Sequence, residues 1–333
     1  MTEIPNGSPI RNKIAEAESI HGLFSLTARH TRRARRLRLA AARVFRRAPC
    51  YADDLKTASR APLLFRLTNR MVRANIRGSS RLMGILAARG VLDVVVQYPL
   101  GKSVFGVPLW RNPMELEDLV RYESALINLF CSRISGMTDA VLFDCGADIG
   151  IFSSAICTRS GALSNIVAFE PNGDAFPWLE KNMAALPVSA QACHNAVADF
   201  VGKGKLESPG YDQDYTARFL VQGDGPVTVT TIDTFRNFGR NVAIKIDVEG
   251  GEIDVLRGAE ETIRSARAVV IAIEAHPQVA GRTGLDPVVC LRFLESIRSF
   301  QFSVAETGEN VSTDRPILKP GQTEVHNIVC ATV

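Results

Sequence analysis

The 333-residue sequence lacks both a long apolar segment and paired cysteines. Its longest apolar runs, near residues 91–96 and 268–275, have the length of buried strands, whereas a membrane-spanning helix needs about 20 apolar residues. The seven cysteines are odd in number and contain no C-x-x-C pair, which argues against a zinc site and a disulfide framework. The polar start, MTEIPNGSPI, has no apolar core of a secretory signal. We therefore expect a cytoplasmic protein without a metal site.

Two common phosphate-binding fingerprints are also missing. After an apolar run at 141–144 the chain reads D-C-G-A-D-I-G, from Asp144 to Gly150. The dinucleotide pattern G-x-G-x-x-G would need glycine at position 148, which is Asp148, and no Gly-Lys-Ser/Thr follows as in a P-loop. Two acids in this turn suit a cationic ligand better than a pyrophosphate. The sequence therefore argues against a nicotinamide oxidoreductase, which remains a weaker alternative.

Charge is divided unequally along the chain. Residues 1–110 hold 20 basic and 6 acidic residues, a net charge of +14, whereas residues 111–333 hold 19 and 29, a net charge of −10. The hydrophobic fraction of 46% is too high for a disordered chain. We predict two regions with different partners: a basic, largely helical region at 1–110 with a short strand pair near 91–110, and a catalytic domain at 111–333.

The basic region contains two helical patterns. The first is the arginine-rich stretch 31–49, and the second runs over 63–78, where Gly78 and two serines end it. In the second pattern five arginines share one helical face (Arg66, Arg70, Arg73, Arg77, Arg81), opposite an apolar set (Leu64, Phe65, Met71, Val72, Ile76). Such a surface binds a membrane, nucleic acid or an anionic substrate. The alternative is a solvated helix whose apolar side packs on the main domain.

The second region alternates strands and helices. Apolar strands are predicted at 141–144, 166–170, 191–197, 242–247 and 268–274, with helices at 150–159, 174–185, 253–265 and 288–299. A helix at 114–134 precedes them, and strands at 300–305 and 325–330 close the chain. This order predicts an α/β fold, a doubly wound and mostly parallel sheet covered on both faces. Ligands of such sheets bind at the carboxyl ends of the strands.

Polar residues gather at those strand ends. Glu170 ends the second strand about 25 residues after Asp144, where a carboxylate accepts hydrogen bonds from ribose hydroxyls. Asn195 follows the third strand and is a candidate for an adenine edge. The fourth strand ends in K-I-D-V-E-G-G-E at 245–252. A helix dipole accounts for acids such as Glu252, but Asp247 belongs to the predicted strand, so we interpret it as a site residue.

Taken together, these segments resemble a known family. In order stand D-C-G-A-D-I-G at 144–150, F-E-P-N at 169–172, N-A-V-A-D-x-x-G at 195–202, T-T-I-D at 230–233, K-I-D-V-E-G-G-E at 245–252 and V-L-R-G-A at 255–259. The set is similar to FkbM-type methyltransferases over roughly residues 115–333. The resemblance implies a Rossmann-like sheet of the class I methyltransferase type with an antiparallel last strand, S-adenosylmethionine as cofactor, and O-methylation of a hydroxyl on a small molecule or glycan.

The resemblance also implies roles for individual residues. Asp144, Gly146, Ala147 and Gly150 would form the loop around the methionine part of the cofactor, Glu170 would hold the ribose, Asn195 and Ala196 would lie near the adenine, and Asp247 would sit beside the sulfonium and the methyl acceptor, with Glu249 and Glu252 close by. Asp233 would support the site or a strand turn. The family usually has valine and asparagine where this chain has Cys145 and Asp148.

An alcohol must lose a proton on methylation, so a general base is needed. The candidate catalytic residues are Asp247, Glu249 and His276. The loops at 203–226, with Tyr211, Tyr215 and Arg218, and at 276–286 are expected to face the methyl acceptor, whose identity stays open, as does the oligomeric state. Two alternatives remain: an RNA methyltransferase that uses the basic region as a clamp, and a non-catalytic relative at the inner face of a membrane.

Overall fold

The computed structural model describes residues 56–58, 62–74, 76–92, 94–100, 103–109, 123–207, 219–237 and 239–333. The predicted helix at 31–49, the start of the helix predicted at 114–134 and the segment with Tyr211, Tyr215 and Arg218 lie outside the described residues. The chain divides into two compact units, of which the first is described over Pro62–Leu92 and the second contains the remaining described residues.

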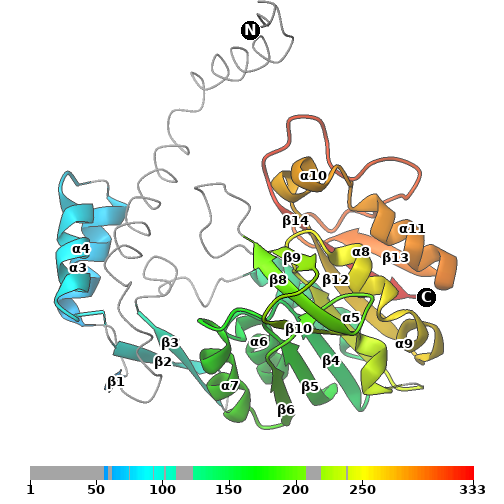
Figure 1. Cartoon of the computed structure of the whole chain (residues 1–333), viewed down its shortest axis with the longest axis horizontal. Helices are drawn as coiled ribbons and strands as arrows, with labels where there is room; N and C mark the ends of the chain where they lie inside the picture. Colours follow the sequence, from blue (N-terminus) through cyan, green and yellow to red (C-terminus); the bar gives the residue numbers. More distant parts are fainter. Residues whose placement is uncertain are drawn as a thin grey trace, which may run out of the picture. The chain divides into compact units, whose positions relative to one another are not determined.

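A seven-stranded sheet forms the centre of the second unit (Figure 1). Its order is β13 (Phe300–Val304), β14 (His326–Thr332), β12 (Val269–Ala275), β11 (Val242–Ile246), β4 (Ala140–Cys145), β5 (Leu163–Phe169) and β6 (Ser189–Cys193). Five neighbouring strands from β12 to β6 are parallel, and β14 pairs antiparallel with both β12 and β13. The predicted mostly parallel sheet with an antiparallel last strand is therefore confirmed.

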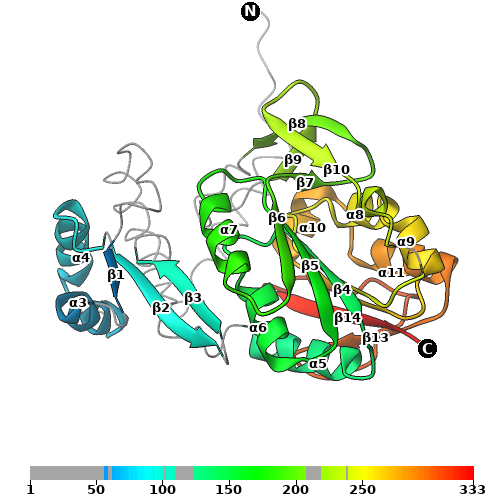
Figure 2. The ribbon, with the colours of Figure 1, turned by 90° about the horizontal axis from the view of Figure 1, so that it is seen from below.

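Helices cover both faces of this sheet (Figure 2). One face packs against α5 (Ser124–Ile134), α6 (Ile151–Arg159) and α7 (Phe176–Ala184), and the other against α8 (Glu252–Arg257), α9 (Glu260–Ser265) and α11 (Val288–Ile297). Every residue of β4 and β11 is buried, because strands covered on both faces have no polar side. Along β11, Ala243 faces the first helix layer, and Val242, Ile244 and Ile246 face the second.

A three-stranded sheet packs on the same unit. The strands β2 (Val94–Leu100) and β3 (Ser103–Pro108) form the strand pair predicted near 91–110, and β1 (Lys56–Ala58) runs parallel to β2. The buried Asn182 of α7 fastens the hairpin: its Oδ1 accepts from the Gly106 N–H at 2.8 Å, and its Nδ2 donates to the carbonyls of Gly106 and Ile149. The domain division after residue 110 stays a prediction.

A four-stranded sheet corrects two predictions. It has the order β7 (Ala196–Val197), β10 (Val227–Thr230), β8 (Gly202–Glu207) and β9 (Phe219–Gln222). The predicted strand 191–197 is divided between β6 and β7, because the chain turns where the Asn195 N–H donates to the Cys193 carbonyl. The predicted loop 203–226 contains most of β8 and all of β9. The start of β8, Gly-Lys-Gly-Lys, has none of the apolar alternation that identifies a strand.

The helix predicted at 253–265 and the loop predicted at 276–286 also differ from the structure. The first is two helices, α8 and α9, because Gly258 lies so close to the chain at Ala198 that a Cβ there would be 2.0 Å from its carbonyl oxygen. The carboxylate of Asp233 accepts from the N–H groups of Thr262 and Glu261, so it caps the start of α9. The second segment contains α10 (Pro277–Thr283). Asp247 follows β11 instead of belonging to it.

The first unit contains a pair of short helices where one helix over 63–78 was predicted. The helix α3 (Leu63–Arg73) ends before the turn at Gly78, whose φ is 87°, and α4 (Ser79–Ala88) begins directly after it. The five arginines therefore do not share one helical face, and Leu64 and Ile76 are exposed instead of facing a core. Within the described part of the chain, no helix is long and apolar enough to cross a membrane.

Candidate functional site

The carboxyl ends of β4, β5 and β11 meet in a tightly bonded turn. The N–H groups of Gly146 and Ala147 donate to the Phe169 carbonyl at 3.0 and 2.9 Å, and the Asp247 N–H donates to the Cys145 carbonyl at 3.0 Å. The loop after β4 is therefore fixed between the ends of its two neighbours. This edge, where the parallel strands β4, β5, β6, β11 and β12 end, is called the carboxyl edge below.

Backbone conformation explains the glycines of the loop. Gly146, Asp148 and Gly150 have φ angles of 79°, 49° and 85°, a region in which only glycine, asparagine and aspartate are common. A Cβ at Gly146 would lie 1.9 Å from the carbonyl oxygen of Asp247, and one at Gly150 would lie 2.6 Å from Met183. Bare backbone at both positions therefore lets the loop pack directly against the end of β11 and against α7.

Glu170 joins the ends of β4 and β5. It is 8% exposed, its Oε2 accepts from the Asp148 N–H at 2.8 Å, and its Oε1 accepts from the Asn172 N–H at 2.7 Å. Its own N–H donates to the Cys193 carbonyl at the end of β6. A carboxylate fixed in this way is a preorganised hydrogen-bond acceptor at the position that the sequence predicts for ribose binding.

Asp144 is a buried acid with an incomplete set of hydrogen bonds. The side chain is fully buried, its Oδ2 accepts from the Ser153 hydroxyl at 2.6 Å, and its Oδ1 has no partner. Burial raises the pKa of this carboxyl. Buried polar atoms in folded proteins nearly always have a hydrogen-bond partner, so Oδ1 is an acceptor ready for a ligand's donor.

Lys245 and Asp247 form an ion pair at the end of β11. The Lys245 Nζ lies 2.8 Å from the Asp247 Oδ2, and it also lies 5.7 Å from the centre of the Phe152 ring. Lys245 is 5% exposed, whereas the Asp247 side chain is 26% exposed. Lys245 and Asp144 are register partners in β11 and β4, so their side chains share one face of the sheet. The lysine is thus held beside two of the predicted cofactor-binding acids.

Two further acids at this edge are absent from the predicted site residues. Glu274 in β12 lies on the same sheet face as Lys245, and burial together with the charge of Asp247 raises its pKa to about 9. Glu123, directly before α5, has its pKa raised to about 7, mainly by burial. The apolar strand that ends in Glu274 is visible in the sequence and places Glu274, with His276, on the same rim as the predicted site residues. Nothing in the sequence around Glu123 indicates that it is close to β11.

Three predicted catalytic or adenine-side residues have structural roles of their own. His276 is the N-cap of α10, where its Nδ1 accepts from the Gln278 N–H at 3.1 Å. Glu249 has a φ of 61°, and its carbonyl accepts from Arg282. Ala196 is buried in β7 against the core of the small sheet. The structure thus brings Asp144, Gly146, Ala147, Gly150, Glu170 and Asp247 together at the carboxyl edge, with Asn195 directly after the neighbouring strand β6.

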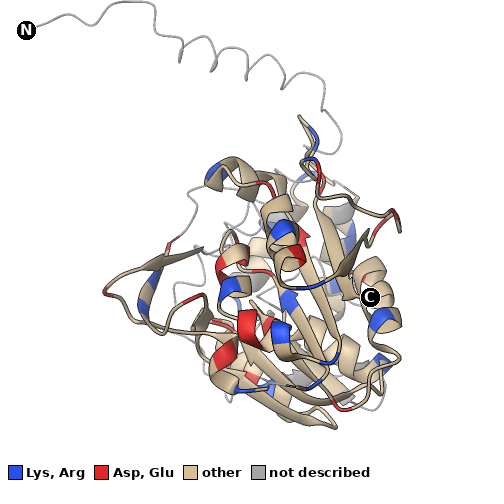
Figure 3. Ribbon diagram, turned by 90° about the vertical axis from the view of Figure 1, so that its right-hand side faces the viewer, with Lys and Arg blue, Asp and Glu red and all other residues tan. Residues whose placement is uncertain are grey.

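Charges on α8 and α9 follow the helix dipole. Both helices carry acids in the first turn, including Glu252, and an arginine in the last turn, which Figure 3 shows as neighbouring red and blue segments. The Oε1 of Glu252 accepts from the Gly250 N–H at 2.9 Å, and burial raises the pKa of the carboxyl. The helix dipole therefore accounts for an acid at position 252, the first residue of α8.

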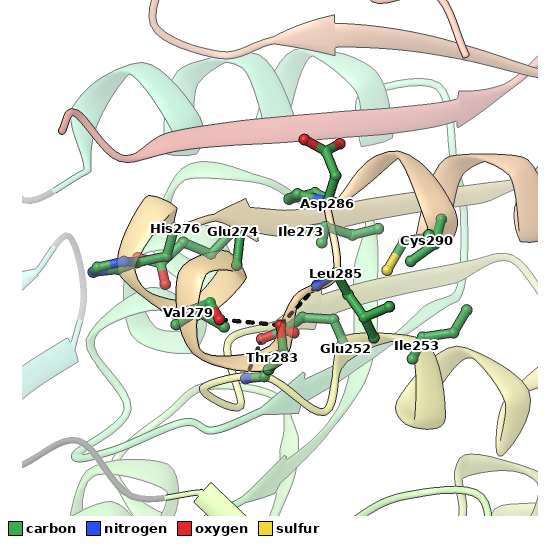
Figure 4. Close-up of a pocket in the computed structure, with 14 residues that line it drawn as sticks. Glu252, Ile253, Ile273, Glu274, His276, Val279, Thr283, Leu285, Asp286 and Cys290 are labelled. Carbon is green, nitrogen blue, oxygen red and sulfur yellow. Dashed lines mark hydrogen bonds between the residues drawn. The ribbon is translucent and has the colours of Figure 1, made fainter. Parts of the chain in front are cut away.

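A small pocket lies between the end of β12 and the helices α8, α10 and α11 (Figure 4). Glu274 and His276 lie toward one end and Cys290 toward the other. Its volume of about 20 Å³ holds a single water-sized group. It is too small for a nucleoside or a sugar. Among the described residues, no group of three His, Cys, Asp or Glu side chains is arranged to hold a metal ion.

Comparison with known proteins decides the family. The model of the methyltransferase FkbM domain matches residues 144–303, which contain the ends of all five parallel strands at the carboxyl edge. The hexuronic acid methyltransferase AglP of Haloferax volcanii is 30% identical over 185 residues, which are 54% of this chain and 68% of that protein. The chain belongs to the FkbM methyltransferase family.

Solved methyltransferase structures are also among the matches. The FkbM methyltransferase of Methylobacillus flagellatus KT matches with a TM-score of 0.36 and 16% identity, over 66% of this chain and 59% of that one. A precorrin-6y C5,15-methyltransferase of Geobacter metallireducens GS-15 matches with a TM-score of 0.34 and 12% identity, over 62% of this chain and 88% of that one.

Membership of the FkbM family makes S-adenosylmethionine the cofactor of this chain. The residues of the carboxyl edge fit it. The unpartnered Oδ1 of Asp144 can accept from an ammonium group, and the carboxylate of Glu170 is a fixed acceptor. Acids near a sulfonium cation stabilise it electrostatically.

Proposed function

We propose that the chain is an S-adenosylmethionine-dependent O-methyltransferase that methylates a hydroxyl of a glycan or another small molecule. The observation that carries this proposal is the partly exposed Asp247, paired with Lys245 beside the glycine loop after β4. The relative AglP is named a hexuronic acid methyltransferase, which supports a sugar as the methyl acceptor.

In this proposal Asp144, Gly146, Ala147 and Gly150 hold the methionine part of the cofactor, Glu170 accepts from its ribose hydroxyls, and Asn195 and Ala196 border its adenine. When bound, S-adenosylmethionine supplies a methyl group attached to a positively charged sulfur. The loop is already fixed by backbone hydrogen bonds to Phe169. The chain therefore contributes mainly alignment of the acceptor oxygen with that methyl group, which is the largest part of what this reaction needs.

The same site must remove the hydroxyl proton, and we propose Asp247 as the group that accepts it. The raised pKa values of Glu274, about 9, and Glu123, about 7, keep the first protonated and the second partly protonated at neutral pH. The Nδ1 of His276 already accepts from Gln278. Asp247 is paired with an ammonium group and is partly exposed, so it can meet a substrate. Glu249, two residues further along, is the second candidate.

The charge of the carboxyl edge favours a hydroxyl as the methyl acceptor. A hydroxyl donates a hydrogen bond to a carboxylate such as Asp247, whereas a carboxylate acceptor would meet its like charge.

Part of the proposal concerns the basic region. We propose that residues 111–333 form the methyltransferase domain and that residues 1–110 meet an anionic surface, either nucleic acid or the inner face of a membrane, in the cytoplasm. The support is the net charge of +14 over residues 1–110 against −10 over the remainder.

Calorimetric titration with S-adenosylhomocysteine, followed by transfer of a radiolabelled methyl group to glycans, hexuronic acids and simple alcohols, tests the proposal. Asp247→Asn is compared with Asp254→Asn, in which a carboxylate paired with Arg257 is removed outside the carboxyl edge. We expect the first variant to lose at least about 100-fold in turnover while the second keeps wild-type activity.

The product distinguishes the two kinds of oxygen. A methylated hydroxyl is an ether that survives mild alkali, whereas a methylated carboxyl is an ester that alkali cleaves. An alkali-labile product would contradict the hydroxyl proposal, wild-type turnover of folded Asp247→Asn would remove this residue from the mechanism, and a folded protein that does not bind S-adenosylhomocysteine would contradict the cofactor site.

A further inference from the structure

The pair of helices α3 and α4 exposes an unusual share of aliphatic side chains. In the described part of the chain nine large hydrophobic residues are exposed, and five of them lie between residues 63 and 85 (Leu63, Leu64, Leu67, Ile76, Ile85). The three leucines at the start of α3 are 67%, 50% and 48% exposed. Exposed aliphatic side chains that gather in one place indicate a binding surface.

The same segment is strongly basic. Residues 62–92 contain six arginines and no acid (Arg66, Arg70, Arg73, Arg77, Arg81, Arg89). On α3, Leu63, Leu67 and Arg70 follow spacings of four and three, so they form one stripe of the helix surface. Leucine and guanidinium groups therefore lie side by side on the exposed side of α3.

The buried side of α3 shows the opposite preference. Thr68 and Asn69 are buried together with Phe65 and Val72, and both amide atoms of Asn69 lack a hydrogen-bond partner. When the outer face of a surface helix contacts only water, its leucines are usually on the buried face and its amide side chains on the exposed face. The exposed leucines of α3 are thus better suited to an apolar environment than to water.

We propose that the α3–α4 helix pair, residues 62–92, docks on a bilayer surface that carries anionic phospholipids. Leu63, Leu64 and Leu67 enter the interfacial layer, and the arginines pair with lipid phosphates. Arginine charge alone would fit nucleic acid equally well, but a nucleic acid backbone offers exposed leucines no apolar contact. This inference rests on the proposal that the basic region meets an anionic surface, and it is independent of methyl transfer.

Charge along the chain supports this choice of partner. Basic segments next to an anionic leaflet are attracted to it, and acidic segments are repelled. Residues 62–92 have a net charge of +6, whereas residues 111–333 have a net charge of −10. An anionic bilayer therefore selects the helix pair over the methyltransferase part of the chain.

Co-sedimentation of the full chain with vesicles tests the inference. Vesicles of phosphatidylcholine alone are compared with vesicles that also contain phosphatidylglycerol. The variant Leu63→Gln/Leu64→Gln/Leu67→Gln removes the apolar contribution and keeps every charge. Val201→Gln is the matched control, because Val201 is 69% exposed in the second unit. We expect wild type and the control to bind the anionic vesicles and the triple variant to bind about tenfold or more weakly.

Other outcomes overturn the inference. Equal binding of the triple variant and wild type would show that the leucines do not enter the bilayer, and equal binding to both kinds of vesicle would exclude recognition of anionic lipid. Tight binding to RNA with no vesicle binding would assign the basic surface to nucleic acid. Titration with S-adenosylhomocysteine in the same variants is expected to stay at the wild-type level, so failure of the membrane surface and failure of the proposed methyl transfer can be told apart.

Discussion

Replacing Gly146 with alanine tests whether the loop after β4 must lie directly against the end of β11. The added Cβ would lie 1.9 Å from the carbonyl oxygen of Asp247 and 2.9 Å from its carbonyl carbon, both of them backbone atoms that cannot rotate away. The φ of 79° adds a conformational cost that glycine does not have. The substitution therefore acts on the position of the loop without changing any charge.

The expected losses of affinity and stability in Gly146→Ala follow from this geometry. Alanine in the left-handed region costs about 1–2 kcal/mol. To regain a contact of about 3 Å the loop and the end of β11 must separate by roughly 1 Å, and a displacement of that size in an active site costs about 100-fold. We expect Gly146→Ala to bind S-adenosylhomocysteine about 100-fold more weakly and to lose at least about 2 kcal/mol in the free energy of unfolding.

Calorimetric titration and urea denaturation measure the two quantities. Gly136→Ala is the matched control, because a Cβ at Gly136 meets no atom within 4 Å and its φ lies outside the left-handed region. We expect its affinity and stability to stay near wild type. If Gly146→Ala binds within twofold of wild type and unfolds at the same urea concentration, the close contact between Gly146 and Asp247 is not needed for the site.

Three further predictions concern stability. Because the raised pKa of Glu274, about 9, favours its neutral form in the folded protein, its contribution to stability is complete below its unfolded value of 4.5 and is lost as the pH rises toward 9. In this pH range, urea unfolding should show the free energy of unfolding of Glu274→Gln rising relative to that of wild type by at most about 1.4 kcal/mol per pH unit. A difference between the two free energies that does not change with pH would contradict the raised pKa. Asp233→Ala removes the cap of α9 and should cost about 1–2 kcal/mol by urea denaturation, whereas no loss would mean that water replaces the cap. Asn182→Ala removes three hydrogen bonds from a buried amide, two of them to Gly106, and should cost about 2–4 kcal/mol; hydrogen exchange in β2 and β3 should then rise, and unchanged exchange would show that other contacts hold the hairpin.

The parallel sheet could be predicted because its strands are buried on both faces. Runs such as Val242–Ile246 are almost entirely apolar, and polar residues with glycine mark their ends. The same reasoning found Asp144, Glu170 and Asp247, since acids at three strand ends meet at one edge of the sheet. Local sequence therefore located the predicted cofactor-binding acids without any knowledge of how the strands pair.

The features that could not be predicted depend on contacts between residues that are far apart in the sequence. The break between α8 and α9 comes from the close approach of Gly258 to Ala198, about 60 residues earlier in the chain, while helix propensity alone favours one continuous helix. The strand β8 begins with Gly-Lys-Gly-Lys and shows no apolar alternation, so only its pairing with the apolar residues of β9 identifies it as a strand. Glu123 joins the carboxyl edge only because α5 packs on the sheet beside β12 and β14.

Cys145 and Asp148 stand where the family usually has valine and asparagine, and the structure accommodates both residues. Cys145 is fully buried, and its side chain belongs to the core with Val141 and Phe143, on the sheet face opposite to Asp144. Burial raises its pKa well above the usual value, so the thiol stays neutral and replaces a valine as a small apolar group. Asp148 has a φ of 49°, which asparagine and aspartate both accept, and the contact that ties it to Glu170 is made by its backbone N–H. That contact does not depend on the side chain, so aspartate at position 148 keeps it.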